Sequence, residues 1–140
     1  MTTAPRMLQP DGWATPNGYA NGMTAQGRLI CIAGQVGWDP VTTRFATDDF
    51  AGQVTQALKN VVAVLAVGGG TPSQLVRMTW FITDKAAYLA ARREIGHAYR
   101  EIIGRHFPAM SVVVVSALIE DAAKVEIEAT AVIPIHPLHP

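Results

Sequence analysis

Glu126 is the residue of this sequence whose type and position most strongly suggest chemistry. It stands in the segment 124–132, KVEIEATAV, where apolar residues alternate with polar ones as in a strand with one apolar face. A carboxylate in such a strand is either an ordinary solvated side chain or a group that points into a cleft. In a cleft it could act as a general acid or base. The pattern alone leaves both interpretations open.

The other residues that often carry chemistry do not form a recognisable set. Ser111 and Ser116 lack histidine and aspartate partners at the spacing of a hydrolase triad. The glycine triplet at 68–70 follows a predicted helix, whereas a phosphate cradle precedes one. His136 and His139 lie in a proline-rich tail, and the single Cys31 is expected to pack inside a buried strand. We therefore expect no metal and no cofactor.

Composition narrows the class of protein. The 140 residues suit one domain, with an N-terminal arm at 1–17 and a tail at 135–140. Eleven Lys and Arg balance eleven Asp and Glu, and the N-terminus does not resemble a secretory signal. We expect a cytoplasmic protein with neither nucleic acid nor membrane as a partner. Only 16% of the residues are charged, which favours an oligomer in which part of the surface is buried.

Hydrophobic periodicity predicts an α+β fold with the element order ββαβαββ. Strands are expected at 19–24, 28–36, 74–83, 111–118 and 124–132, and those at 28–36 and 111–118 are apolar enough to be buried on both faces. Asp48 and Asp49 begin one helix that ends at Gly68, and Asp84 begins another that ends near Gly104. We expect one mixed sheet with both helices on one face. The opposite face would then be covered by other subunits.

Three stretches of the sequence resemble the Rid family, also called YjgF or reactive-intermediate deaminase. They are AGQV at 33–36 followed by Asp39 and Pro40, TWFITD at 79–84, and FPAMS at 107–111 leading to KVEIEATA at 124–131. The similarity extends over residues 19–132. It implies a chorismate-mutase-like fold and a homotrimer with a small-molecule ligand in each intersubunit cleft. Well-known members hydrolyse enamines and imines, such as 2-aminoacrylate, to keto acids and ammonia without a cofactor.

The same resemblance implies roles for individual residues. Glu126 matches the glutamate that places or activates water, and Tyr19 matches a pocket tyrosine. Met110 stands where the family has the arginine that binds the substrate carboxylate, Ala33 where it has a serine, and Gly96 where it has an asparagine. The remaining residues expected at the cleft are Gly34, Gln35, Trp38, Ala109, Ser111 and Val112.

The methionine at position 110 separates this sequence from the well-known members. It removes a fixed charge and several N–H donors. The sequence thus resembles a branch of the family that lacks this arginine, and we predict a more apolar cleft that takes a larger, less anionic substrate than 2-aminoacrylate. Arg77, Arg92 and Arg93 could replace the missing cation, but nothing in the sequence places them in the cleft.

Three functions are consistent with these observations. The first is a cofactor-free hydrolytic deaminase or tautomerase of enamines and imines, with Glu126 as acid or base and Tyr19 as an orienting group. The second is a non-catalytic trimer that binds a small molecule or acts like a chaperone. The third, a ribonuclease or translation inhibitor, is disfavoured by the zero net charge.

Overall fold

The computed structural model describes residues 4–135, so His136, His139 and most of the predicted tail lie outside it. Its elements, in chain order, are β1 (Arg6–Leu8), β2 (Gly22–Thr24), β3 (Arg28–Val36), α1 (Phe50–Val67), the short 3₁₀ helix η1 (Pro72–Gln74), β4 (Leu75–Ile82), α2 (Lys85–Ala90), α3 (Arg92–Ile102), β5 (Ala109–Val114) and β6 (Val125–Ile133).

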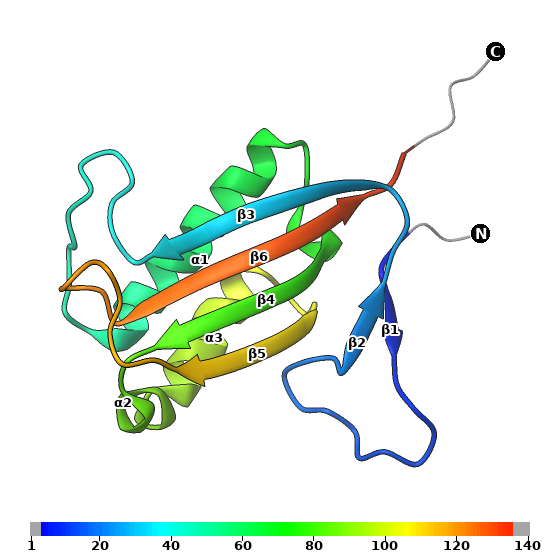
Figure 1. Cartoon of the computed structure of the whole chain (residues 1–140), viewed down its shortest axis with the longest axis horizontal. Coiled ribbons are helices and arrows are strands. Elements are labelled where there is room, and N and C mark those ends of the chain that lie inside the picture. The colour runs from blue at the N-terminus through cyan, green and yellow to red at the C-terminus, as the bar shows by residue number, and fades with distance from the viewer. Residues whose placement is uncertain (1–3, 136–140) are drawn as a thin grey trace.

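The predicted α+β architecture is confirmed. Four strands form one mixed sheet in the order β3-β6-β4-β5, in which β4 and β5 run parallel and the other pairs are antiparallel. Helices α1 and α3 lie behind this sheet in Figure 1, on one face only. No described element covers the opposite face, which we call the open face.

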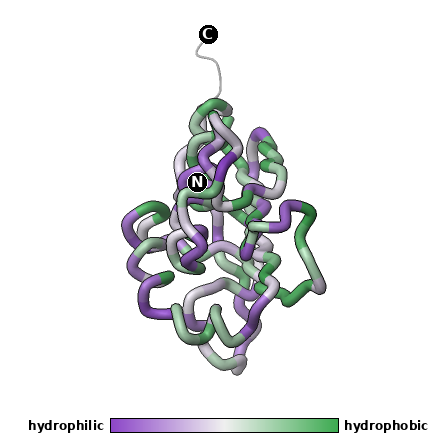
Figure 2. The backbone as a smooth tube through the Cα atoms, turned by 90° about the vertical axis from the view of Figure 1, so that its left-hand side faces the viewer, coloured by the Kyte–Doolittle hydropathy of each residue, from purple (hydrophilic) through white to green (hydrophobic). Residues whose placement is uncertain are grey.

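The hydrophobic core lies between the sheet and α1 and α3. Alternate residues of β4 and β6 face the helices and are fully buried, whereas the intervening residues face the open side. Figure 2 shows hydrophobic and hydrophilic stretches interleaved along the chain, as this alternation requires. The largest contributors to the core are Leu58, Leu65, Leu75, Met78, Trp80, Ile82, Val125 and Ile127.

Helix α1 is the central helix of this core. The Asp49 carboxylate caps its start by accepting a hydrogen bond from Gly52 N at 2.9 Å, and Gly68 caps its end, both as predicted. By length and mean hydropathy, 1.3, α1 could span a membrane, but half of it is buried inside the fold. Its contacts are those of a core helix.

The N-terminal segment is more ordered than predicted. Residues 6–8 form β1 and pair with β2 in a separate antiparallel ribbon. In this ribbon Arg6 lies opposite Thr24, and Leu8 lies opposite Gly22. The strand predicted at 19–24 is correspondingly short, and β2 is not part of the main sheet, although Ala20 just before it forms an isolated bridge to Ala109 of β5. Apolar Met7 and Leu8 are isolated among prolines and polar residues, so periodicity could not indicate this strand.

Two strands expected to be buried on both faces are exposed on one face in the single chain. They are the edge strands of the sheet: on the open face, Leu29 of β3 is 61% exposed and Val113 of β5 is 40% exposed. Cys31, expected to be an inert core residue, is also exposed. The apolar content of these strands indicates burial without showing which chain provides the cover.

The second predicted helix is interrupted. It begins at the predicted cap Asp84, whose carboxylate accepts from Ala87 N at 3.0 Å, but it breaks at Ala91 into α2 and α3. Ala91 has non-helical backbone angles, φ −99° and ψ 8°. Nothing in the sequence marks this break.

Tyr99 secures the end of α3 and gives a testable pH dependence. Its buried hydroxyl donates to the His106 carbonyl oxygen at 2.5 Å, and burial raises the pKa of Tyr99 well above its ordinary value. An unfolded tyrosine ionises near pH ~10. The folded state holds the neutral phenol, so the stabilisation is complete below that pH and is lost as the pH rises beyond it.

We therefore expect Tyr99→Phe to lower the free energy of unfolding by about 1 kcal/mol at neutral pH, through the lost hydrogen bond. The difference in free energy of unfolding between wild type and variant, measured by urea titration, should be smaller at about pH 11 than at about pH 8. A gap that stays constant with pH would contradict this assignment.

Candidate functional site

The Glu126 carboxylate lies directly over the backbone of Gly34. The pairing of β3 with β6 shifts register between Ile32 and Gln35, so Gly34 falls in a bulge beside Glu126. A Cβ added at Gly34 would come within 2.7 Å of Glu126 Cδ, and closer still to its carboxylate oxygen. Glycine is therefore needed for this approach. Across residues 4–135 no hydrogen bond engages this carboxylate, which leaves its oxygens available to water or a ligand.

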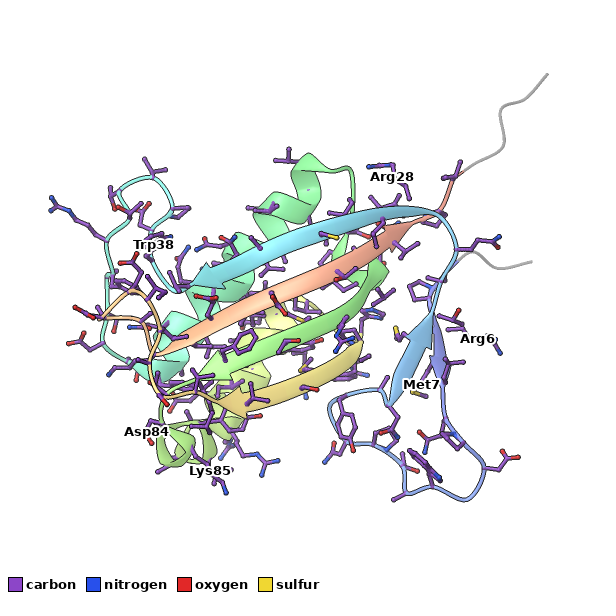
Figure 3. The ribbon with its side chains drawn as sticks, in the orientation of Figure 1. Arg6, Met7, Arg28, Trp38, Asp84 and Lys85 are labelled. Carbon is purple, nitrogen blue, oxygen red and sulfur yellow. The ribbon has the colours of Figure 1, made fainter. Side chains whose placement is uncertain are left out.

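The other predicted residues of β3 surround this position. Gln35 Nε2 donates to the Ala33 carbonyl oxygen at 3.1 Å. Trp38 follows the strand; its carbonyl oxygen accepts from Asn60 Nδ2 at 3.0 Å, and its ring lies 5.9 Å from that of Phe45. Figure 3 shows Trp38 at the end of the sheet opposite the ribbon that carries Met7. Ala33 lines an open-face groove of about 410 Å³ together with Arg77, Thr79 and Glu128.

A second group of predicted residues gathers at the start of β5. Tyr19, Ala109, Met110 and Ser111 line one pocket of about 290 Å³, to which Arg77 also contributes. The N-terminal segment is held there by a bridge between Ala20 and Ala109 and by the hydrogen bond from Ala20 N to Pro108 O, 3.0 Å.

Met110 also borders a pocket on the helix side of the sheet, which we call the α3 pocket. Its volume is about 280 Å³, and Gly96 forms part of its wall. No atom lies within 4 Å of where a Cβ at Gly96 would stand, so this part of the wall is open. Val112, predicted as a cleft residue, is partly buried and packs against the core, as Met110 also does. The lining residues are Asn17, Gly18, Trp80, Tyr88, Arg92, Ile95, Gly96, Tyr99, Arg100, Phe107 and Met110.

Within one chain these two groups are separated. Glu126 lies level with Phe81 of β4, and Met110 lies level with Met78 on the other side of that strand. Strand geometry puts their Cα atoms about 10 Å apart along the sheet and about 10 Å across it, or roughly 14 Å in all. Their side chains also leave opposite faces, because Met110 packs on the core and Glu126 does not. A single chain thus contains two half-sites, one at each end of the sheet.

Position-by-position reasoning missed most of the α3 pocket. Arg92 and Arg100 line it, whereas Arg93 does not, and Arg77 lies in the pocket beside Tyr19. The available signal was the four-residue spacing of Tyr88, Arg92, Gly96 and Arg100. That spacing places these residues on one stripe of a helix. The break at Ala91 and the presence of Trp80 in the same pocket depend on the tertiary fold, so the spacing could not predict them.

Comparison with known proteins agrees with this arrangement of elements. A family model described as endoribonuclease L-PSP matches residues 12–133. A RutC family protein of Haemophilus influenzae is 35% identical over 106 residues, covering 76% of this chain and 80% of the relative. Human 2-iminobutanoate/2-iminopropanoate deaminase is 30% identical over 105 residues, covering 75% of this chain and 73% of the human protein.

Among solved structures, a Yersinia pestis protein of the conserved Rid family, YyfB, of unknown function, superimposes with a TM-score of 0.81 and 30% identity. The match covers 93% of this chain and 99% of that one. The fold, the matched residues and the sequence identity together show that the chain belongs to the endoribonuclease L-PSP family, whose members are also named Rid, YjgF and RutC.

Proposed function

We propose that this protein is a cofactor-free hydrolytic deaminase of imines and enamines that acts at clefts between the subunits of a homotrimer. The observation that supports this most directly is the unpaired Glu126 carboxylate over Gly34, at one end of an uncovered sheet face. The human relative is named as a deaminase of two 2-imino acids, which is the same class of substrate.

The two half-sites give the reason for placing the cleft between subunits. The Glu126 and Met110 side chains lie at opposite ends and leave opposite faces of one sheet, with their Cα atoms roughly 14 Å apart, so a small ligand does not contact both in one chain. A closed ring of identical chains places one end of each sheet against the other end of its neighbour. Exposed Leu29 and Val114 on the edge strands supply apolar surface for such contacts.

The proposed chemistry needs only water and one acid–base group. Glu126 takes a proton from a water molecule as the water oxygen bonds to the carbon of the protonated imine, giving a neutral carbinolamine. The protonated carboxyl gives this proton to the nitrogen, and as the C–N bond breaks the carboxylate takes the hydroxyl proton, so that the C=O bond forms and ammonia leaves; the carboxyl then releases its proton to solvent. An enamine first takes a proton at carbon to become the imine. Tyr19 would orient the substrate at the rim of the other half-site.

Met110 makes a testable difference in substrate range. We expect Met110→Arg to raise kcat/KM for 2-iminopropanoate by about ten- to a hundred-fold, because a charge-assisted bond to a carboxylate contributes about 1.5–3 kcal/mol. The kcat/KM values are measured by ammonia release from imino acids that an amino-acid oxidase generates in situ. Met110→Leu is the matched control, and equal kcat/KM values for the two variants would show that position 110 does not lie in the cleft.

The same assay tests the proposal as a whole. Wild type should release ammonia from one or both of two sets, small charged imino acids and imino acids with aromatic or long apolar side chains. The proposal favours the second set, because the α3 pocket is lined mainly by apolar and aromatic side chains. Absence of release from both sets by wild-type trimer would overturn the proposal.

A second candidate is a non-catalytic trimer that binds a small molecule. It is favoured by the departures from the family pattern at Met110, Ala33 and Gly96, which remove the polar groups expected around a reacting carboxylate. A ligand that binds tightly and is recovered unchanged, with no Glu126-dependent turnover of any imine, would favour this function over hydrolysis.

A further inference from the structure

The α3 pocket has two properties that the proposed hydrolysis does not use. Its inner wall is aromatic, and its rim carries two arginines that have no carboxylate partner among residues 4–135. Each property points to a feature of the ligand that would occupy the pocket.

The aromatic wall consists of Trp80, Tyr88, Tyr99 and Phe107. Tyr99 and Phe107 stack with their ring centroids 5.4 Å apart and an angle of 7° between the planes, although Phe107 is 42% exposed. Tyr88 is held edge-on against Phe50 at 6.3 Å. Rings fixed in this way offer a preorganised surface for another aromatic ring, which gains from offset or edge-to-face contact.

The two arginines flank a gap in α3. Arg92, Gly96 and Arg100 are spaced by four residues and so follow one stripe of the helix. The Cα atoms of the two arginines are about 12 Å apart along the axis, and each side chain is long enough to reach inward over the gap at Gly96. In the part of the chain that the structure describes, neither guanidinium forms an ion pair, and no Asp or Glu lines the pocket. The local charge therefore favours an anion.

Trp80 adds a third observation. It is 2% exposed. Its indole Nε1–H is buried and, among the residues described, has no hydrogen-bond partner. A buried donor without a partner destabilises a fold, and such groups are rare in native proteins. Because Trp80 lines the α3 pocket, an acceptor atom of a ligand could supply the missing partner.

We propose that the α3 pocket binds an aromatic carboxylate, with its ring against the aromatic wall and its carboxylate between Arg92 and Arg100. This proposal rests on the proposed function in one respect: the natural ligand would be a 2-imino acid substrate with an aryl side chain. The loss of a cation at Met110 predicted a less anionic substrate. The proposal revises this prediction, because Arg92 and Arg100 of α3 supply positive charge to the pocket. Binding can be measured without turnover, so the two proposals can fail separately.

The test is calorimetric titration of the intact protein with 3-phenylpropionate, which cannot be hydrolysed. The comparison ligands are neutral 3-phenylpropanamide and propionate, which lacks the ring. The acid should bind more tightly than either. Because both arginines are exposed, Arg92→Gln and Arg100→Gln should each weaken its binding by about two- to five-fold, and the double variant by about ten-fold. Affinity for the amide should not change.

Arg93→Gln is the matched control, because Arg93 neighbours Arg92 on α3 but does not line the pocket. Gly96→Trp should fill the gap and abolish binding, whereas His97→Trp, one residue further along α3, should not. Equal affinity in the Arg92/Arg100 double variant and Arg93→Gln, or in Gly96→Trp and His97→Trp, would overturn the proposal. Binding that follows this pattern without ammonia release would uphold the pocket and reject the hydrolysis.

Discussion

Glu126→Gln is expected to reduce ammonia release by about 10²- to 10⁴-fold, the usual contribution of a positioned acid–base group. The amide keeps the size of the side chain and fits over Gly34, but it cannot take a proton from water. Because Glu126 makes no hydrogen bond within the described residues, its replacement should change the free energy of unfolding by no more than about 0.5 kcal/mol. The loss should therefore fall on kcat in a protein that is fully folded.

Glu128→Gln is the matched control for this experiment. Glu128 lies two residues further along β6, on the same open face, and lines the groove that also includes Ala33. Loss of one carboxylate from the open face should leave turnover within about two-fold of wild type if only Glu126 reacts. Turnover that is equal in the two variants would show that Glu126 is not the acid–base group.

The second large effect is expected at Gln53, a buried polar residue of α1. Its Nε2 donates to the carbonyl oxygens of Thr47 and Ala122 at 3.1 and 2.9 Å, and its Oε1 accepts from Lys124 N at 2.8 Å. The side chain is fully buried. Gln53→Leu leaves these backbone groups without partners and should lower the free energy of unfolding by about 3 kcal/mol.

Gln53 also links the core to the candidate site. It holds Lys124, two residues before Glu126, at the point where β6 begins. We expect Gln53→Leu to reduce kcat even under conditions where the variant is folded. Urea unfolding measures the stability, with Gln26→Leu as the control because Gln26 is exposed and should change stability by at most about 0.5 kcal/mol. Equal stability of the two variants would contradict the role assigned to Gln53.

Sequence patterns predicted those parts of the fold that depend on local chemistry. Asp49 and Asp84 marked helix starts because their carboxylates accept hydrogen bonds from the first turn, and the glycines at 68–70 marked the end of α1, where Gly69 adopts a φ of 83°. The break at Ala91 was missed, since alanine favours helices and only packing opposes one there. The apolar content of β3 and β5 predicted burial, but apolar strands do not reveal whether the element that covers them belongs to the same chain.

The candidate site was predictable only in part, for a similar reason. The resemblance implied that Glu126, Gly34 and Met110 share a cleft between subunits, and in a single chain Glu126 and Gly34 lie together while Met110 is separate from them. Local spacing contained the stripe of Arg92, Gly96 and Arg100, yet only the tertiary structure places Trp80 and Phe107 against it. A positive charge that one strand carries in relatives can be supplied by a helix in this chain. A comparison of single positions, such as Met110 with the family's arginine, does not detect such a replacement.

The most direct test of the central claim, a cleft shared between two subunits, is complementation in mixed trimers. Glu126→Gln removes the reacting group from one half-site, and Gly96→Trp blocks the pocket of the other. Each variant alone should be inactive. When the two are co-expressed with different tags and purified as hybrids, one of the three clefts in each hybrid trimer should combine an intact Glu126 with an intact α3 pocket, so activity should recover to about a third of that of wild type. Hybrids of Glu126→Gln with a chain that carries both Glu126→Gln and Gly96→Trp have no intact cleft and are the control. Hybrids of the two single variants that are as inactive as this control would contradict the shared cleft.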